Sequence, residues 1–285
     1  MTAVTTGSIL ISGRIVPVPG LAITPPASAG GPAWARLDRG DCTSRHGWVR
    51  QVIVHTTGGD WPMPIGAGAG AGGECPRYAD IWQTDPAHSA AHLVVDSAGA
   101  VACLADLATT TAYHAEGSNP WSVGIEMVQA HDGTVFQATI DACTLLVAAI
   151  CDAIGIPEQM PRGPYRGGPL RRMEVIQDGR RINTGGPDCI GVFGHRDNTS
   201  QRGRGDPGDA IWTALAGLGF EGWDYAAGED MAVARARQRT LGVADDGLVG
   251  PGSLAAMRGA GYARWRDVPQ ANGPAASAVA RSPRP

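Results

Sequence analysis

Two short apolar runs, far apart in the chain, each end at a histidine. The run "RQVIVH" (50–55) ends at His55, and the run "DCIGVFG" leads directly into His195. A short apolar run bounded by turn residues is typical of a buried strand. We therefore predict two buried strands, each ending in a histidine at the start of a glycine-rich loop. In open α/β sheets, ligands bind at this end of the strands.

Strand and helix patterns alternate along the rest of the chain. Apolar and polar residues alternate enough over residues 8–18 to predict a strand pair or an edge strand. The segment "AHLVVDSAGAVACL" predicts a strand, a turn and a second strand. "SVGIEMVQ" (122–129) predicts a further strand, whereas residues 137–154 place their apolar side chains on one helical face. Pro207 favours a helix start. The alternation predicts an α/β fold with a mixed β-sheet flanked by helices.

The length of 285 residues suits one large domain, or a domain with a small appendage. We expect residues 1–47 to form a strand and loop extension and residues 48–222 to form the main domain. Residues 228–268 predict a small helical unit, with a helix, a DG turn and a second helix. Residues 269–285 are rich in Pro, Ala and Ser and are predicted to be disordered.

Charge and hydropathy set further expectations. The net charge of −4 gives no electrostatic reason to expect nucleic acid or a membrane surface as a partner. We predict that no apolar stretch reaches membrane-spanning length. The N-terminus has no basic region before its apolar run, so it does not predict a signal peptide, and we expect synthesis in the cytoplasm.

The six cysteines have no CxxC spacing and do not predict a disulfide scaffold. Cys143 and Cys151 lie at helical spacing in an apolar stretch and are expected to be reduced core residues. Cys42 and Cys75 are expected in loops, where they could pair, but nothing in the sequence decides this.

A possible ligand set for a metal includes the two strand-end histidines. Asp206 stands between Gly205 and Pro207 in the loop that follows His195. Two imidazoles and one carboxylate form a three-ligand set for Zn²⁺ that leaves the fourth position open, as catalysis requires. The spacing alone is a weak signal because there is no HExxH motif. The alternative is two capping or core histidines and a turn aspartate.

Four motifs in order strengthen this interpretation: "VIVHTTGG", "AHLVVDSAGAV", "TAYHAEGSNPWSVGIEMV" and "GHRD…GDPG". Together they resemble the type 2 N-acetylmuramoyl-L-alanine amidases, in the superfamily that includes the peptidoglycan-recognition proteins. The resemblance covers roughly residues 48–220. It implies a mixed sheet flanked by helices, one zinc ion, and cleavage of the amide between the lactyl group of N-acetylmuramic acid and L-alanine.

The resemblance assigns roles residue by residue. It makes His55, His195 and Asp206 the zinc ligands, and Glu126 in "SVGIEMV" the general base, as in the murein-recycling and lipoprotein branches. A zinc site needs such a carboxylate to move protons from water to the leaving amine. Without the resemblance, Glu126 on an apolar strand is a buried acid that needs a partner, and functional acids are often found in such places. The alternative is a structural ion pair.

Two departures from the family pattern affect the predicted mechanism. Arg204 stands where the family usually has Lys; we expect it to stabilise the oxyanion and not to donate a proton. Ala91 stands where some branches have Tyr, so the proton transfer is expected to depend on Glu126.

Candidate substrate contacts lie in or near the same motifs. His114 matches the family's "WHAG" turn and is expected either to touch substrate or to be structural. Trp61 and Asn119 are further candidate contacts. His92 is expected to be a packed strand histidine.

The small C-terminal unit resembles the peptidoglycan-binding domain built of short helices. The matching residues are Gln238, "LGV" (241–243), "DG" (246–247), "GP" (250–251) and Leu254. The unit is expected either to bind cell wall or to pack on the main domain.

We therefore predict a monomeric zinc amidase that acts on peptidoglycan, made in the cytoplasm and released to the wall as a phage or prophage endolysin with a holin. The alternatives are a cytosolic muropeptide-recycling amidase and a non-catalytic peptidoglycan-recognition protein. The wall-binding resemblance argues against the first, and the complete ligand set argues against the second. A glycosidase would need two facing carboxylates, and the sequence offers no such pair.

Overall fold

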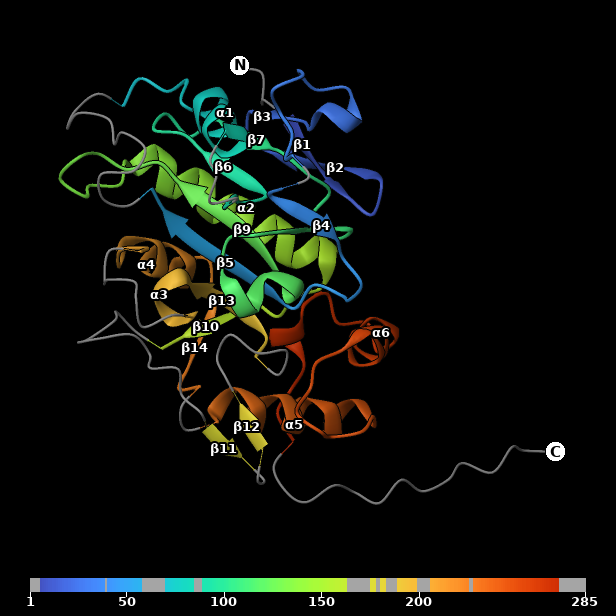
Figure 1. The fold of residues 1–285 in the computed structure, drawn as a ribbon. Coiled ribbons are helices and arrows are strands. Elements are labelled where there is room, and N and C mark those ends of the chain that lie inside the picture. Colours follow the sequence, from blue (N-terminus) through green and yellow to red (C-terminus); the bar gives the residue numbers. More distant parts are fainter. Residues whose placement is uncertain are drawn as a thin grey trace, which may run out of the picture.

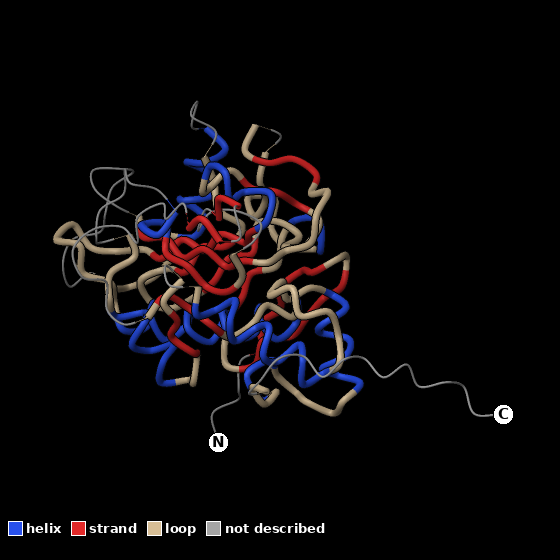
Figure 2. The backbone as a smooth tube through the Cα atoms, turned by 90° about the horizontal axis from the view of Figure 1, so that it is seen from below, coloured by secondary structure: helices blue, strands red, loops and turns tan. Residues whose placement is uncertain are grey.

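A six-stranded mixed sheet runs through the middle of the molecule (Figure 1). The structure is a computed structural model, and it describes residues 6–38, 40–57, 70–84, 89–162, 175–177, 180–182, 189–198, 206–225 and 228–271. Seen from below, the strands gather toward the centre with helices on the outside (Figure 2).

The order of the strands determines which chain segments share an edge. In space they run β13 (Gly191–Gly194), β5 (Gln51–Thr56), β9 (Ser122–Met127), β6 (Leu93–Val95), β7 (Val101–Cys103) and β3 (Ile23–Thr24). The first four are mutually parallel, β7 is antiparallel to β6, and β3 is parallel to β7. The predicted mixed sheet flanked by helices is confirmed. The carboxyl ends of β13, β5 and β9 therefore meet at one edge.

The sheet has two chemically different faces, because successive side chains of a strand point to opposite sides. Val123, Ile125 and Met127 of β9 belong to the main apolar cluster, which also includes residues of α2 (Gln137–Ile154) and α4 (Ala210–Gly217). We call this the core face. The alternate residues Ser122, Gly124 and Glu126 lie on the other side, which we call the site face.

Helix α2 differs from one sequence expectation. It has 18 residues and is apolar enough to be a candidate membrane span by length and composition, contrary to the prediction that no stretch reaches that length. Half of the span is buried inside the structure. The buried side chains, such as Ile140, Leu146 and Val147, pack with those of the core face, and a helix that covers a sheet needs this composition.

The remaining elements surround the sheet. Four strand pairs lie outside it: β1 (Thr6–Ile11) with β2 (Arg14–Pro19), β4 (Cys42–Ser44) with β8 (Thr110–Ala112), β10 (Gln159–Pro161) with β14 (Glu221–Trp223), and β11 (Val175–Gln177) with β12 (Arg180–Ile182). The other α-helices are α1 (Cys75–Thr84), α3 (His195–Asn198), α5 (Glu229–Leu241) and α6 (Pro251–Gly259). Three 3₁₀ helices cover Ala27–Ala29, Glu116–Trp121 and Trp265–Asp267.

Local details correct several sequence expectations. Helix α4 begins at Ala210, with Asp209 as its N-cap, and not at Pro207. Cys75 is not in a loop but opens α1, where it is buried, and Cys42 begins β4. Both are free cysteines, so the possible pairing is not formed. Cys143 and Cys151 are buried and reduced, as predicted.

The C-terminal unit packs on the sheet domain (Figure 1). Its side chains Leu254, Met257 and Trp265 share an apolar cluster with Ile190, and Trp48 packs against that cluster. The Arg237 guanidinium is buried and donates to both carboxylate oxygens of Glu221, each at 2.7 Å. It also donates to the carbonyl oxygens of Val268 and Arg266.

These contacts attach the unit to Ile190, directly before β13, and to Glu221 of β14. At the other end of the chain, β3 pairs with β7 and joins the central sheet. The domain limits drawn from the sequence stay a prediction, and most of the tail, residues 272–285, lies outside the described residues.

Candidate metal centre

The two strand-end histidines and the loop aspartate come together at the edge of the sheet. His55 ends the apolar part of β5, His195 follows β13 directly, and Asp206 lies beside them. His195 Nδ1 is 2.9 Å from His55 Nδ1 and 3.0 Å from Asp206 Oδ2. One potential ligand atom from each residue lies within 4.8 Å of the others. The structure therefore brings the three predicted ligands together.

Asp206 is held in place by two backbone amides. The amide of Thr56 donates to Asp206 Oδ1 at 3.0 Å, and the amide of Arg196 donates to its carbonyl oxygen at 2.8 Å. Gly194 makes this approach possible, because a Cβ there would lie 2.6 Å from Pro207 Cδ. The glycine of "FGHRD" therefore lets the "DPG" turn close over the end of β13.

Asp197 contacts the backbone at the end of β13. Its Oδ2 accepts a hydrogen bond from the Gly194 amide at 2.7 Å. Burial raises the pKa of this carboxyl to about 6, because a low-dielectric site disfavours the ionised form. Asp197 is two residues from the ligand His195, and it accepts this hydrogen bond from the backbone of β13.

Glu126 lies opposite His55 in the sheet. The two residues are register partners in the parallel pair β5 and β9, so their side chains leave the same face. Glu126 is partly exposed, unlike its buried neighbours in the strand. This position suits a group that must reach both the ligand cluster and solvent. Its role as general base stays a prediction.

Tyr78 of α1 is a neighbour of Glu126 that the sequence analysis did not single out. It is 2% exposed, and burial raises the pKa of its hydroxyl, with the charge of Glu126 adding to the shift. The spacing of Tyr78, Ala79 and Trp82, all buried in α1, was the available signal for this helix.

His114 lies next to His55 on the site face. Its Nδ1 is 2.9 Å from His55 Nε2, and its Nε2 is 3.1 Å from Ser122 Oγ. Burial lowers the pKa of His114 well below its usual value, and the nearby His92, His195 and Arg45 lower it further. These conditions favour a neutral ring.

Asn119 fixes the loop that presents His114. Its Oδ1 accepts hydrogen bonds from the amides of His114 and Ala115 at 3.0 and 2.6 Å. The side chain thus has a positional contact in the structure, and its contact with substrate stays a prediction.

His92 is a buried histidine, as predicted, and does not belong to the ligand group. It is fully buried just before β6; its Nδ1 accepts from the Gly124 amide at 3.0 Å, and its Nε2 lies 3.0 Å from the carbonyl oxygen of Thr110. Burial, together with the charge of Arg45, lowers the pKa of His92 to about 3. The ring is therefore neutral at ordinary pH.

Two of the predicted site residues fall outside the described part of the chain. Arg204 and Trp61 lie outside the described residues, as does most of the glycine-rich segment after His55 (58–69). Their roles stay predictions.

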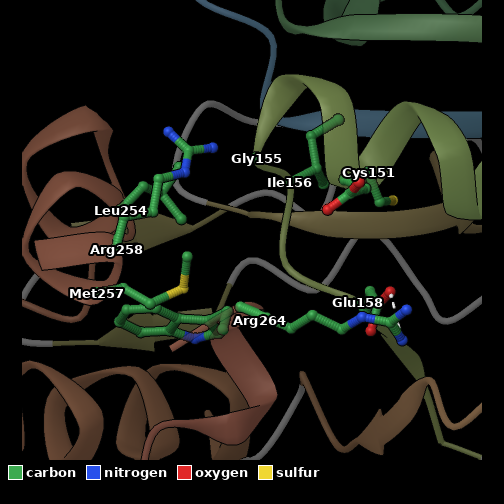
Figure 3. Close-up of a pocket in the computed structure, with 11 residues that line it drawn as sticks. Cys151, Gly155, Ile156, Glu158, Leu254, Met257, Arg258 and Arg264 are labelled. Atoms are coloured by element: carbon green, nitrogen blue, oxygen red, sulfur yellow. Dashed lines mark ion pairs between the residues drawn. The ribbon is translucent and has the colours of Figure 1, made fainter. Parts of the chain in front are cut away.

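A cavity of about 120 Å³ lies elsewhere, between the end of α2 and the C-terminal unit (Figure 3). Ile156 and Met257 line it, and Glu158 and Arg264 form an ion pair at 3.5 Å beside it. Its lining includes none of the candidate site residues. The chemistry suggested by the sequence is therefore concentrated at the sheet edge and not in this cavity.

The residues at the sheet edge fit a zinc ion. Zinc in catalytic sites takes three protein ligands of the His and carboxylate type at about 2.0–2.2 Å, and two nitrogens bound tetrahedrally lie about 3.3 Å apart. The 2.9 Å between the two Nδ1 atoms is close to that spacing. His55 and His195 are 3% and 6% exposed, and the Asp206 side chain is 14% exposed. Three acceptor-type groups this close, and this buried, need a proton or a cation between them.

The fold and this group define an α/β protein with three potential metal ligands gathered at one sheet edge. The family model described as N-acetylmuramoyl-L-alanine amidase matches residues 45–209, more than half of the chain. The chain therefore belongs to the N-acetylmuramoyl-L-alanine amidase family, whose members are enzymes that hydrolyse peptidoglycan. The predicted family and enzyme class are confirmed.

Two other comparisons complete this picture. Among solved structures, the chain is similar to the crystal structure of Staphylococcus aureus hydrolase AmiA in complex with its ligand, with a TM-score of 0.37 and 14% identity over 61% of this chain and 77% of that one. No curated protein matches the chain. The family assignment rests on the family model.

Proposed function

We propose that this protein is a zinc-dependent amidase that hydrolyses the bond between N-acetylmuramic acid and L-alanine in the cell wall. The observation that carries the proposal is the convergence of His55, His195 and Asp206 at the sheet edge, within the segment that the family model matches. These three residues would hold one Zn²⁺. When bound, zinc would polarise the scissile carbonyl and make water a better nucleophile.

The proton transfer is assigned to Glu126. Its position opposite His55 puts a carboxylate on the same face as the ligand group. Glu126 would accept a proton from the attacking water and pass it to the nitrogen of the departing L-alanine. This leaves a free amino group on the peptide and a free carboxyl group on the lactyl ether.

Arg204 is proposed to stabilise the negative charge that develops on the carbonyl oxygen. A guanidinium supplies charge and hydrogen bonds but cannot donate its proton at neutral pH. Arg204→Lys should therefore keep substantial turnover, whereas Arg204→Ala should lose about 10²–10³-fold. Turnover of both variants at matched zinc content tests this. Equal turnover in Arg204→Ala and the wild type would remove Arg204 from the mechanism.

The site of action is proposed to be the wall, after synthesis in the cytoplasm and release by a phage-type lysis system. The resemblance of the C-terminal unit to wall-binding modules supports intact wall over soluble fragments. Within the unit, the matching residue Gln238 donates to Asp246 Oδ1 and to the carbonyl of Leu248, so it holds the unit together. Wall binding by the unit, the monomeric state and the phage origin stay predictions.

The deciding experiment is digestion of purified sacculi and identification of the new ends. We expect new L-alanine amino termini, loss of this activity on treatment with a chelator, and recovery with zinc. New reducing sugars would show that a different bond is cleaved. Efficient cleavage of soluble muropeptides together with inactivity on sacculi would favour the recycling enzyme, and no cleavage of either would favour a recognition protein.

A further inference from the structure

A chain of hydrogen bonds leads from Ser122 through His114 to His55, on the side of the His55 ring that faces away from the ligand group. The Ser122 hydroxyl is 2.7 Å from the carbonyl oxygen of Ser118 and 3.1 Å from His114 Nε2. His114 Nδ1 in turn is 2.9 Å from His55 Nε2. This chain of hydrogen bonds therefore ends on the ring nitrogen of His55 that does not face His195.

The chemistry of these groups fixes the direction of each hydrogen bond. A carbonyl oxygen can only accept, so the single hydroxyl proton of Ser122 is donated to Ser118. The hydroxyl must then accept from His114 Nε2–H. A neutral imidazole carries one N–H, so His114 Nδ1 has a lone pair and accepts from His55 Nε2–H. His55 Nδ1 is left unprotonated, and it is the nitrogen that faces His195 and lies within the ligand group.

Strand β9 provides the space for the His114 ring. A Cβ on Gly124 would lie 2.5 Å from His114 Cγ and 2.6 Å from its Nδ1. The ring therefore rests directly on the backbone at Gly124, which only glycine permits. Every second residue of β9 lies on the site face. Ser122 is the hydrogen-bond partner of His114, Gly124 leaves space for its ring, and Glu126 is the acid opposite His55.

The same contacts argue against a polar contact between His114 and substrate. Both of its ring nitrogens already have protein partners, at 2.9 and 3.1 Å. A substrate group could bond to either nitrogen only by displacing His55 or Ser122.

We propose that His114 is a positioning residue for the metal centre: it accepts from His55 Nε2–H and so holds His55 in the tautomer that presents an unprotonated Nδ1 to the metal. Ser122 and Gly124 keep His114 in place. The proposal rests on zinc binding by His55, His195 and Asp206. Metal-ligating histidines almost always donate their second N–H to an acceptor, and loss of that acceptor typically costs about 10–100-fold in metal affinity.

The test measures the zinc dissociation constant of the full-length protein by competition with a chromophoric chelator. His114→Phe keeps a ring but removes the acceptor, and zinc binding should weaken by about 10–100-fold. His114→Asn can place an amide oxygen near the former Nδ1 and should recover part of the loss. The matched control is His131→Phe, at an exposed histidine, which should bind zinc as the wild type does.

A second pair of measurements covers the case in which His114→Phe folds poorly. Gly124→Ala changes neither a ligand nor a hydrogen-bonding side chain, but it should push the ring aside and weaken zinc binding. In zinc-free wild-type protein, the ¹⁵N spectrum of His55 should show protonation at Nε2, and this preference should be lost when His114 is displaced.

The outcomes separate this inference from the proposed function. If the wild type binds one zinc and both His114→Phe and Gly124→Ala bind it within twofold of the wild-type affinity, the positioning role is wrong and the zinc site stands. Protonation of His55 at Nδ1 in the zinc-free protein would also overturn the inference. If the wild type binds no zinc, the proposed function fails, and this inference fails with it.

Discussion

The two faces of the central sheet are built from the same strands but show opposite chemistry. On the core face, Val123, Ile125 and Met127 of β9 are buried in an apolar cluster with α2. On the site face, the alternate residues Ser122, Gly124 and Glu126 meet histidines from other segments. One six-residue strand thus contributes to the core with every second residue and to the candidate metal centre with the others. Stability and chemistry should therefore respond separately to changes at adjacent positions.

The largest effect is expected from loss of a ligand on the site face. His195→Ala removes a nitrogen that lies 2.9 Å from His55 Nδ1 and 3.0 Å from Asp206 Oδ2. Zinc content should be lost, and turnover should fall to background because the group that activates the reaction is gone. Metal analysis and a turnover assay check this, with His131→Ala as the control at an exposed histidine. Full zinc content with full turnover would show that the ligand assignment is wrong.

The second effect tests Glu126. Glu126→Gln keeps the shape of the side chain but removes its basicity, so zinc content should be unchanged while turnover falls by about 10²–10⁴-fold. Turnover at matched zinc occupancy is the measurement. Near-wild-type turnover would mean that another group moves the proton.

The third effect comes from the residue next to Glu126, on the opposite face. Ile125 is fully buried in the main apolar cluster. Ile125→Ala should lower the free energy of unfolding by about 2–5 kcal/mol, because it removes buried methyl groups and leaves a cavity. Zinc content and turnover of the folded protein should be unchanged. Denaturant unfolding and metal analysis measure the two responses; a loss of zinc affinity without a loss of stability would contradict the separation of the faces.

The smallest effect, taken per pH unit, is a pH dependence of stability that comes from His92. The pKa of His92 is about 3 in the folded protein, against about 6.5 when unfolded. Between these values the unfolded chain binds the extra proton, so His92 makes stability fall as the pH falls below about 6.5, by up to about 1.4 kcal/mol per pH unit. Above pH 6.5 this contribution is constant.

The contribution of His92 is isolated by comparing the wild type with His92→Asn, because Asn does not titrate. The unfolding free energies of the zinc-free wild type and of His92→Asn should differ most near neutral pH, and this difference should decrease toward pH 4. If the difference in unfolding free energy between the two proteins stays constant over this range, His92 has the same pKa in the folded and unfolded states, and the prediction is wrong.

Much of the sheet could be predicted from sequence because its signals are local. The strand over 50–55 is observed as Gln51–Thr56, and the helix over 137–154 has the predicted limits. The period of two in a strand and the one-sided pattern in a helix depend only on nearby residues. Helix α1 was not predicted, because it is short and follows a glycine-rich segment. Its helical spacing of apolar residues rests mainly on Tyr78, Ala79 and Trp82.

By itself, the sequence determined the α/β class, the family, and His55, His195 and Asp206 as the candidate ligands, because short motifs carry that information. Only the tertiary structure decided what His114 contacts, which nitrogen of His55 faces the ligand group, why residue 124 is glycine, and where the C-terminal unit packs. These features depend on pairs such as His55 and His114, 59 residues apart. The direction of a hydrogen bond or the space for a ring is set by the folded neighbours, and no local pattern encodes it.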